Sequence, residues 1–235
     1  MFPTLMSKTF LILGLSLGLC YFGAYLVIEY FRRAFQQKKS YVTATRNEEG
    51  EYDLEVDQKH LMRLFWPALI LNVIAYFCLL SVRETFPLNM VLMGVFTLTD
   101  GVTLGVVLIS VDENLALRVS WLTALVTVGA GLVSWYSEID FSVIAGLLFW
   151  ALCGLLLFTI YSIFKKIGEF AHQVMAAVGI VIFTGYLLLD FGKLKQAQES
   201  ADLNDWSPAL NMSIHIYLDI INLFLQILKL MGHRH

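Results

Sequence analysis

The last apolar run of this chain has an aspartate at its centre. Asp219 lies within residues 216–225, where Asn222 is the other strongly polar residue, and Asp190 ends the preceding apolar run at 185–190. A carboxylate at bilayer depth costs about 2.5–3.5 kcal/mol on insertion scales, so a chain that keeps two is expected to use them. Two carboxyl groups that meet share a proton and titrate as a coupled pair. The chemistry that these residues predict is proton sensing inside a membrane.

The same run carries further polar residues at helical spacing. They follow one another at intervals of four, four, three and four residues: Asn211, His215, Asp219, Asn222 and Gln226. These intervals place all five on one helix face, and a polar face avoids lipid by turning toward the bundle or a water-filled cavity. For Asn211 and Gln226, near the ends, hydrogen bonding to neighbouring helices is an equally good explanation. His215, one turn from Asp219, would titrate nearer neutrality than a carboxyl.

Three other charged residues each have two interpretations. Asp190 could simply mark the membrane boundary, because lysines follow it closely. Arg83 ends an earlier apolar run and could reach the carboxylates, but spacing alone favours an interfacial arginine paired with Glu84. Asp100, within the threonines and glycines of residues 97–105, could line a pathway or cap a local break in its helix.

Composition predicts the elements that must position these side chains. Of 235 residues, 58% are hydrophobic and 15% are charged, whereas a soluble domain has about 25% charged residues. The apolar residues form seven runs of about 20 residues, the length of a membrane-spanning helix: 9–31, 62–82, 87–110, 116–136, 142–164, 170–190 and 208–231. Glycines at 14 and 18, and at 101 and 105, fit the small-xxx-small pattern of close helix contacts. The sequence predicts an all-α integral membrane protein with a single seven-span domain (1–235), and its net charge of −3 gives no reason to expect nucleic-acid binding.

One substantial polar insert, residues 36–61, separates the first two spans. Two stretches rich in β-forming residues, 41–45 and 52–56, flank a polar segment that contains Gly50. This pattern is typical of a hairpin outside the membrane. An isolated two-stranded hairpin is marginally stable in water, so a flexible loop is an equal alternative.

Two regions of the chain resemble the transmembrane Bax inhibitor motif family (Bax inhibitor-1-like proteins). The first comprises residues 186–190 and 217–224, where an acid and an asparagine are fixed within an apolar octet. The second runs from Arg83 through Asp100 to Leu104, and the resemblance as a whole covers about residues 62–232. It implies seven transmembrane helices with the last helix at the centre of the bundle.

The resemblance also implies a function. Several members behave as pH-sensitive calcium leaks, in which an aspartate pair senses protons and an arginine latches the closed form. Matched onto this chain, the pair is Asp190 and Asp219 and the latch is Arg83. Asn222, His215 and Asp100 are then expected along the pathway. Calcium prefers several oxygen ligands, so the two aspartates would hold it weakly and transiently as the transported ion, and we expect no cofactor.

Alternatives of other classes follow from the same residues. A non-conducting regulator could use the 36–61 loop to bind membrane proteases or cell-death factors. An intramembrane aspartyl protease is disfavoured, because Asp219 lacks a glycine-rich setting, and we expect no enzymatic activity. The positive-inside count places the N-terminus outside, whereas the resemblance places the Arg83 loop in the cytosol. The expected location is a bacterial inner membrane or, in a eukaryote, an intracellular membrane such as the endoplasmic reticulum.

Overall fold

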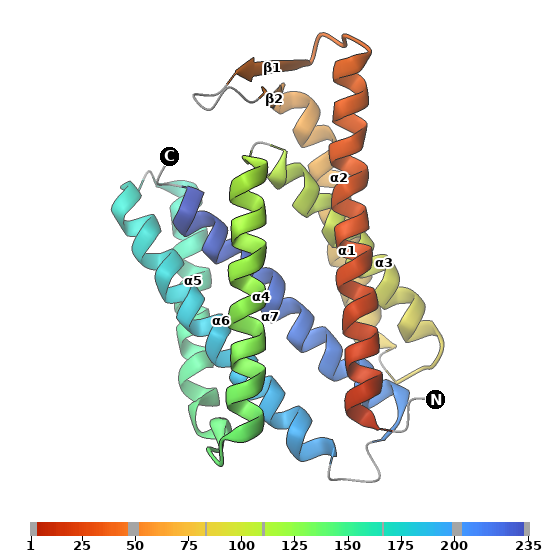
Figure 1. Cartoon of the computed structure of the whole chain (residues 1–235), viewed down its shortest axis with the longest axis vertical. Helices are drawn as coiled ribbons and strands as arrows, with labels where there is room; N and C mark the ends of the chain where they lie inside the picture. Colours follow the sequence, from red (N-terminus) through yellow and green to blue (C-terminus); the bar gives the residue numbers. More distant parts are fainter. Residues whose placement is uncertain are drawn as a thin grey trace. The chain divides into compact units, whose positions relative to one another are not determined.

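The structure is a computed structural model that describes residues 4–46, 52–82, 84–109, 111–165, 167–198 and 204–232. Within these ranges the chain forms seven α-helices, one 3₁₀ helix and one two-stranded sheet (Figure 1). In chain order the elements are α1 (Leu5–Gln36), β1 (Val42–Arg46), β2 (Tyr52–Val56), α2 (Gln58–Ser81), α3 (Leu88–Leu108), α4 (Glu113–Tyr136), η1 (Phe141–Ile144), α5 (Ala145–Phe164), α6 (Glu169–Gln198) and α7 (Trp206–Gly232).

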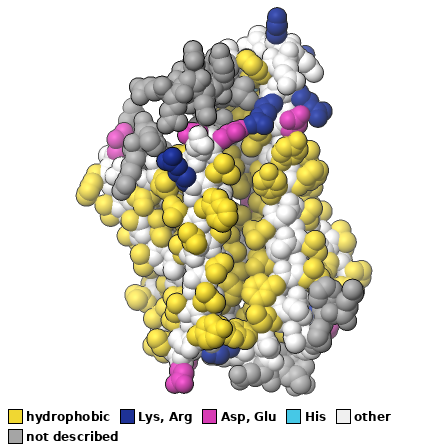
Figure 2. All heavy atoms as spheres, viewed as in Figure 1, with side chains coloured by type: hydrophobic (Ala, Val, Ile, Leu, Met, Phe, Trp, Pro, Cys, Tyr) yellow, Lys and Arg dark blue, Asp and Glu magenta, His cyan; other side chains and the backbone are white. Residues whose placement is uncertain are grey.

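The seven predicted spans are confirmed as helices. All seven described helices are long and apolar enough to cross a membrane. Hydrophobic side chains cover much of the visible face, and charged side chains gather toward the helix ends (Figure 2). Large apolar side chains such as Trp150 and Phe164 are exposed by 73% and 80%, which suits a surface that faces lipid. The protein is therefore a multi-pass membrane protein.

The chain divides into two compact units. The first, which we call the N-terminal unit, comprises Phe10–Glu113 and Trp206–Asn211. The second, the C-terminal unit, comprises Met1–Thr9, Asn114–Asp205 and Met212–His235. The last helix contributes to both, and half of its most apolar 18-residue window is buried, the largest share among the seven described helices.

Close contact between α1 and α3 holds the N-terminal unit together. The backbone of Cys20 fills the space that a side chain at Gly101 would need, and Ala24 and Val27 lie 2.8–2.9 Å from the Cβ position of Gly105. The expected close packing at residues 101 and 105 is therefore present. Residues 14 and 18 differ, because open space surrounds the Cβ positions of both glycines. That part of the prediction is wrong, since the spacing of small residues does not say whether a second helix lies opposite.

These contacts give a direct stability prediction. Gly101→Ala places a methyl group against the Cys20 backbone, which cannot yield as a flexible side chain can, so we expect a loss of about 1–3 kcal/mol. Gly14→Ala adds the same methyl group in open space and should leave stability unchanged or slightly raised, because alanine favours helix. Thermal unfolding of both variants in detergent measures the difference. Equal melting temperatures for the two would contradict the close α1–α3 contact.

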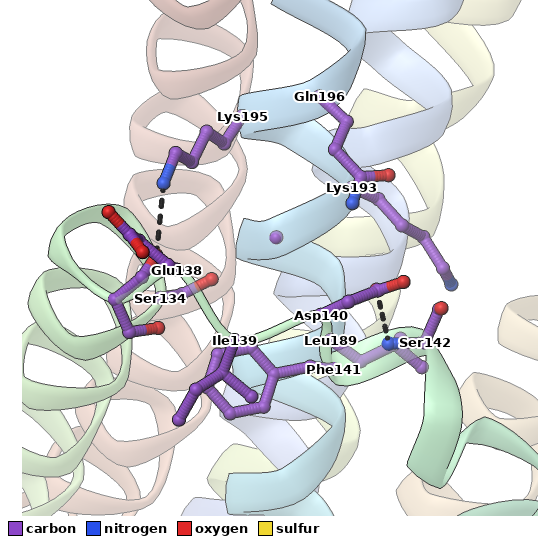
Figure 3. A pocket seen from close by; sticks show the side chains of 12 residues that line it. Ser134, Glu138, Ile139, Asp140, Phe141, Ser142, Leu189, Lys193, Lys195 and Gln196 are labelled. Carbon is purple, nitrogen blue, oxygen red and sulfur yellow. Dashed lines mark hydrogen bonds between the residues drawn. The ribbon is translucent and has the colours of Figure 1, made fainter.

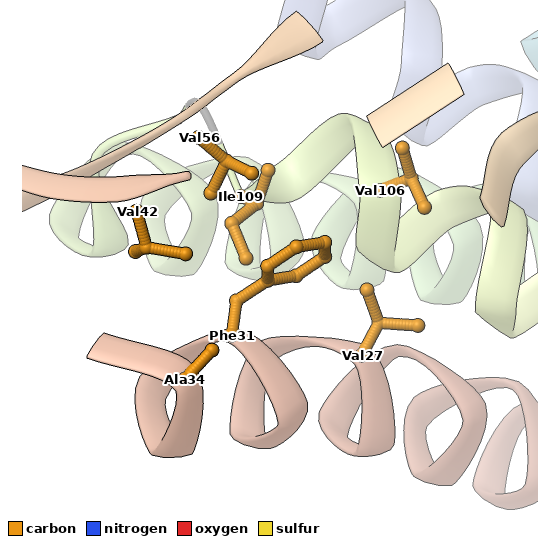
Figure 4. Close-up of a cluster of buried hydrophobic side chains, with 7 residues drawn as sticks. All are labelled: Val27, Phe31, Ala34, Val42, Val56, Val106 and Ile109. Carbon is orange, nitrogen blue, oxygen red and sulfur yellow. The ribbon is translucent and has the colours of Figure 1, made fainter. Parts of the chain in front are cut away.

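The polar insert contains a hairpin. β1 and β2 pair antiparallel, with Val42 opposite Val56. Both valines are buried in a cluster with residues of α1, of α3 and of the C-cap of α3 (Figure 4): Val27, Phe31, Ala34, Val106 and Ile109. Packing on two helices supplies the apolar contact that an isolated hairpin lacks, and this accounts for strands where a loop was the alternative.

Helices α4 to α7 form the C-terminal unit together with η1. The Ser134 hydroxyl of α4 donates a hydrogen bond of 3.0 Å to the Leu188 carbonyl of α6. On another part of α6, a side chain at Gly179 would lie 2.7 Å from carbons of Gln226, so Gln226 of α7 packs directly on the α6 backbone. These contacts fix the two helices that carry the candidate acids.

Candidate functional site

Asp190 lies inside a helix rather than at its end. The predicted sixth span ends at residue 190, but α6 continues to Gln198. The Asp190 residue is 7% exposed, which excludes a solvated boundary position. The longer helix follows from its sequence, because Phe191, Leu194 and Ala197 continue the buried face at helical intervals.

Asp219 meets Asp190 from the neighbouring helix. Asp219 is 8% exposed, and the two side chains are close enough to hydrogen-bond to one another. The Asp219 Oδ2 atom is buried and has no hydrogen-bond partner among the described residues. Buried polar atoms are nearly always satisfied, so this oxygen is where a proton, a water molecule or a cation would be expected to bind.

Lys193 is a site residue that the sequence reasoning missed. Its Nζ donates a hydrogen bond of 2.9 Å to Asp190 Oδ1, and its side chain is 55% exposed while that of Asp190 is 9% exposed. The net charge of Asp190, Asp219 and Lys193 is zero when the two carboxyl groups together keep one proton. The available signal was the three-residue interval from Asp190, which places both side chains on one helix face.

Tyr186 completes the polar environment of the pair. It lies one turn before Asp190 on α6, in electrostatic range of both Asp190 and Asp219. Tyr186 is half-buried. A phenol beside two carboxyls can donate a hydrogen bond to either of them.

A polar cavity of about 190 Å³ lies next to this group (Figure 3). The loop after α4, η1 and the last turns of α6 surround it, and Lys193 is one of its lining residues. Two further lining residues are tied to the backbone: Lys195 donates to the Ser137 carbonyl at 3.1 Å, and the Ser142 N–H donates to Asp140 at 2.9 Å. Hydrogen bonds from Ser142 hold the pKa of Asp140 below its usual value. Lys193 thus links Asp190 to a polar opening.

The other expected site residues have no described contact with the acid pair. The Asn222 amide donates to the Leu218 carbonyl of its own helix at 2.8 Å, which leaves its oxygen for other partners. His215 is exposed, although Asp219 one turn away is buried, so the polar face of α7 is not uniformly enclosed. Arg83, the expected latch, lies outside the described residues.

Asp100 belongs to the N-terminal unit. It is half-buried, and its carbonyl accepts a 2.7 Å hydrogen bond from the Thr103 hydroxyl. α3 runs unbroken from Leu88 to Leu108, so the alternative that Asp100 caps a helix break is wrong. Asn72 of α2 donates to the Phe96 carbonyl of α3 at 3.1 Å, which joins these two helices.

The described part of the chain is that of a multi-pass membrane protein, with seven helices that could span a membrane and a buried pair of acids on the last two. Residues 3–235 match the family described as "Inhibitor of apoptosis-promoting Bax1", and the chain belongs to this Bax inhibitor family.

Similar proteins come from a plant, a yeast and a virus. The chain is 26% identical to Protein LIFEGUARD 1 of Arabidopsis thaliana over 73% of this chain and 72% of that protein. It is 29% identical to Bax inhibitor 1 of Schizosaccharomyces pombe, over 70% of this chain and 61% of that protein. It is 32% identical to the Golgi anti-apoptotic protein of Vaccinia virus (strain Lister), over 66% of this chain and 62% of that protein. The match therefore spans less than two thirds of the yeast and viral proteins.

Proposed function

We propose that this protein is a proton-gated cation leak that passes calcium. The observation that carries the proposal is the buried pair of Asp190 and Asp219, with one Asp219 oxygen that has no partner among the described residues. Such a pair on neighbouring membrane helices is costly to keep. Its proton occupancy changes the local charge, and a change of charge can alter how two helices pack.

The expected direction of the pH effect follows from the charge of the acid pair and from Arg83, the latch that the resemblance implies. When the pair is charged, Asp190 holds the ammonium group of Lys193 at 2.9 Å. Protonation removes the negative charge and weakens this charge-assisted hydrogen bond. Arg83, matched by resemblance to a latch, would be released by the same loss of charge. Lowering the pH is therefore expected to open the pathway.

The ligands available to calcium set the mode of binding. Calcium takes six to eight oxygen ligands in tight sites. Asp190 and Asp219 would supply carboxylate oxygens and Asn222 an amide oxygen. These are fewer ligands than a tight site has, so calcium would bind only briefly during transit. The proposal holds for a bacterial inner membrane or for an intracellular membrane such as the endoplasmic reticulum.

The decisive experiment is calcium flux into proteoliposomes of the purified chain. We expect flux to rise as the pH is lowered through the titration of the pair, relative to protein-free liposomes. Flux that equals that of protein-free liposomes at every pH would overturn the proposal.

A second candidate is a regulator that binds other membrane proteins, and the viral relative's description as anti-apoptotic favours it. The hairpin would be its contact surface. Removing the whole insert would unpack Val42 and Val56 from the cluster around Phe31, so the sharper variant deletes residues 44–54 and rejoins the strand ends with glycine. A regulator should lose its crosslinked partners on this deletion while calcium flux is unchanged. Partners retained by the deletion variant would argue against the hairpin as the contact.

A further inference from the structure

A second and larger pocket lies in the N-terminal unit, outside the site already described. It has a volume of about 460 Å³ and is lined by residues of α1, α2 and α3 and by the start of the hairpin segment. Its apolar wall is formed by Leu26, Val27 and Phe31 of α1, Leu64 of α2 and Val102 of α3. Val27 and Phe31 also belong to the buried cluster drawn in Figure 4, so this wall is fixed by packing.

The remaining lining residues are polar or amphipathic. They are Tyr30, Tyr41, His60 and Arg63. The Tyr41 ring stacks on the His60 ring with centroids 4.3 Å apart and 10° between planes, and the Tyr41 hydroxyl hydrogen-bonds to that of Tyr30. These contacts hold the aromatic part of the rim in place. The pocket is thus apolar on one side and polar on the other.

The rim carries a positive charge at Arg63. His60 Nδ1 lies 3.0 Å from Asp57 Oδ2, and the Asp57 carboxylate also accepts a hydrogen bond from the Lys59 N–H at 3.3 Å. Arg63 is exposed, and it has no ion pair within the described ranges. A guanidinium is a strong and geometrically selective ligand for phosphate. The rim therefore suits an anion.

The position of the pocket along the helices points to the source of that anion. The predicted first span ends at residue 31, past Leu26 and Val27, and Arg32 and Arg33 follow at once. Arg63 is in the second turn of α2, whose first residue is Gln58. The pocket therefore straddles the level at which hydrocarbon meets headgroups, where tyrosine and arginine concentrate in membrane proteins.

We propose that this pocket is a binding site for an anionic phospholipid. The phosphate binds Arg63 with His60 beside it, and the upper part of one acyl chain lies on the wall of Leu26, Val27 and Leu64. The positive charge at the rim favours an anionic headgroup, and the apolar wall favours an acyl chain. Only a ligand that has both parts fits the whole pocket. The site is independent of the acid pair in the C-terminal unit and of whether the protein conducts calcium.

Native mass spectrometry of the full chain in detergent tests the proposal, with phosphatidylglycerol and phosphatidylcholine of identical acyl chains as probes. The wild type should retain phosphatidylglycerol in preference. Arg63→Gln should lower its retention about fivefold, the effect of losing one basic residue at a membrane surface. Lys59→Gln is the matched control, because Lys59 is exposed on the same helix end and does not line the pocket. Leu26→Trp, which fills the apolar side, should lower retention of both lipids.

Several results would overturn the site. Equal losses for Arg63→Gln and Lys59→Gln would mean diffuse attraction to a basic surface. Equal retention of the two lipids by the wild type would remove headgroup selection. Displacement of phosphatidylglycerol by millimolar inorganic phosphate would identify free phosphate as the ligand, and displacement by a sterol would identify an uncharged occupant. Elution profiles identical to the wild type establish that the variants are folded.

Discussion

Replacing Asp219 with asparagine is expected to abolish the pH response of calcium flux. Asparagine keeps the shape of the side chain but cannot take up a proton, so the pair loses the member whose Oδ2 atom has no hydrogen-bond partner in the described part of the chain. For a pathway opened by one proton, the open fraction falls about tenfold for each pH unit above the midpoint. The variant should instead vary by less than about twofold across the same range. Proteoliposome flux measured from acid to alkaline pH gives the result.

The control for this variant is Glu169→Gln. Glu169 is an exposed acid in the first turn of α6, away from the pair. Its replacement removes the same charge and should leave the pH profile unchanged. If Asp219→Asn retains a profile with the wild-type slope and midpoint, the acid pair is not the sensor.

Replacing Lys193 with glutamine is expected to move the pH midpoint of the flux upward. Removing a positive charge 2.9 Å from Asp190 makes the charged form of the pair less favourable, so the pair takes up its proton at a higher pH. The lysine is more than half exposed, and solvent screening limits the effect to about half a pH unit. The measurement is the flux midpoint in proteoliposomes over a fine pH series.

Lys195→Gln provides the matched comparison. Lys195 is two residues further along α6 and donates to the Ser137 carbonyl instead of to an acid of the pair. Its replacement removes the same charge and should not move the midpoint. A shift of equal size in both variants would assign the effect to the general potential at this end of α6.

The sequence predicted the helices well because each apolar run has the length that a bilayer requires. It placed the end of α6 too early, because a lysine was taken as the boundary although Leu194 and Ala197 continue the buried face. Of the four glycines that the sequence placed at close helix contacts, Gly101 and Gly105 lie at one, whereas Gly14 and Gly18 do not. A contact needs a partner helix, and the partner of Gly101 is 81 positions away along the chain.

The candidate site could be predicted only in part. Composition singled out Asp219 as a costly charge, but its partner came from resemblance, since spacing does not determine which helices are neighbours. Lys193 was missed because it was treated as a solvated end. His215 was expected on an enclosed face because periodicity gives the direction of a side chain, whereas its exposure depends on which helix covers that direction.

The Lys193–Asp190 bond joins two residues of the same helix. A bond within one rigid rod moves with the rod, so sliding or tilting of α6 against α7 leaves it intact and separates only the two carboxyls. Lys193 can therefore adjust the pH at which the pair changes state, but it cannot fasten one helix to the other. Mechanical locking would have to come from a residue on a different helix.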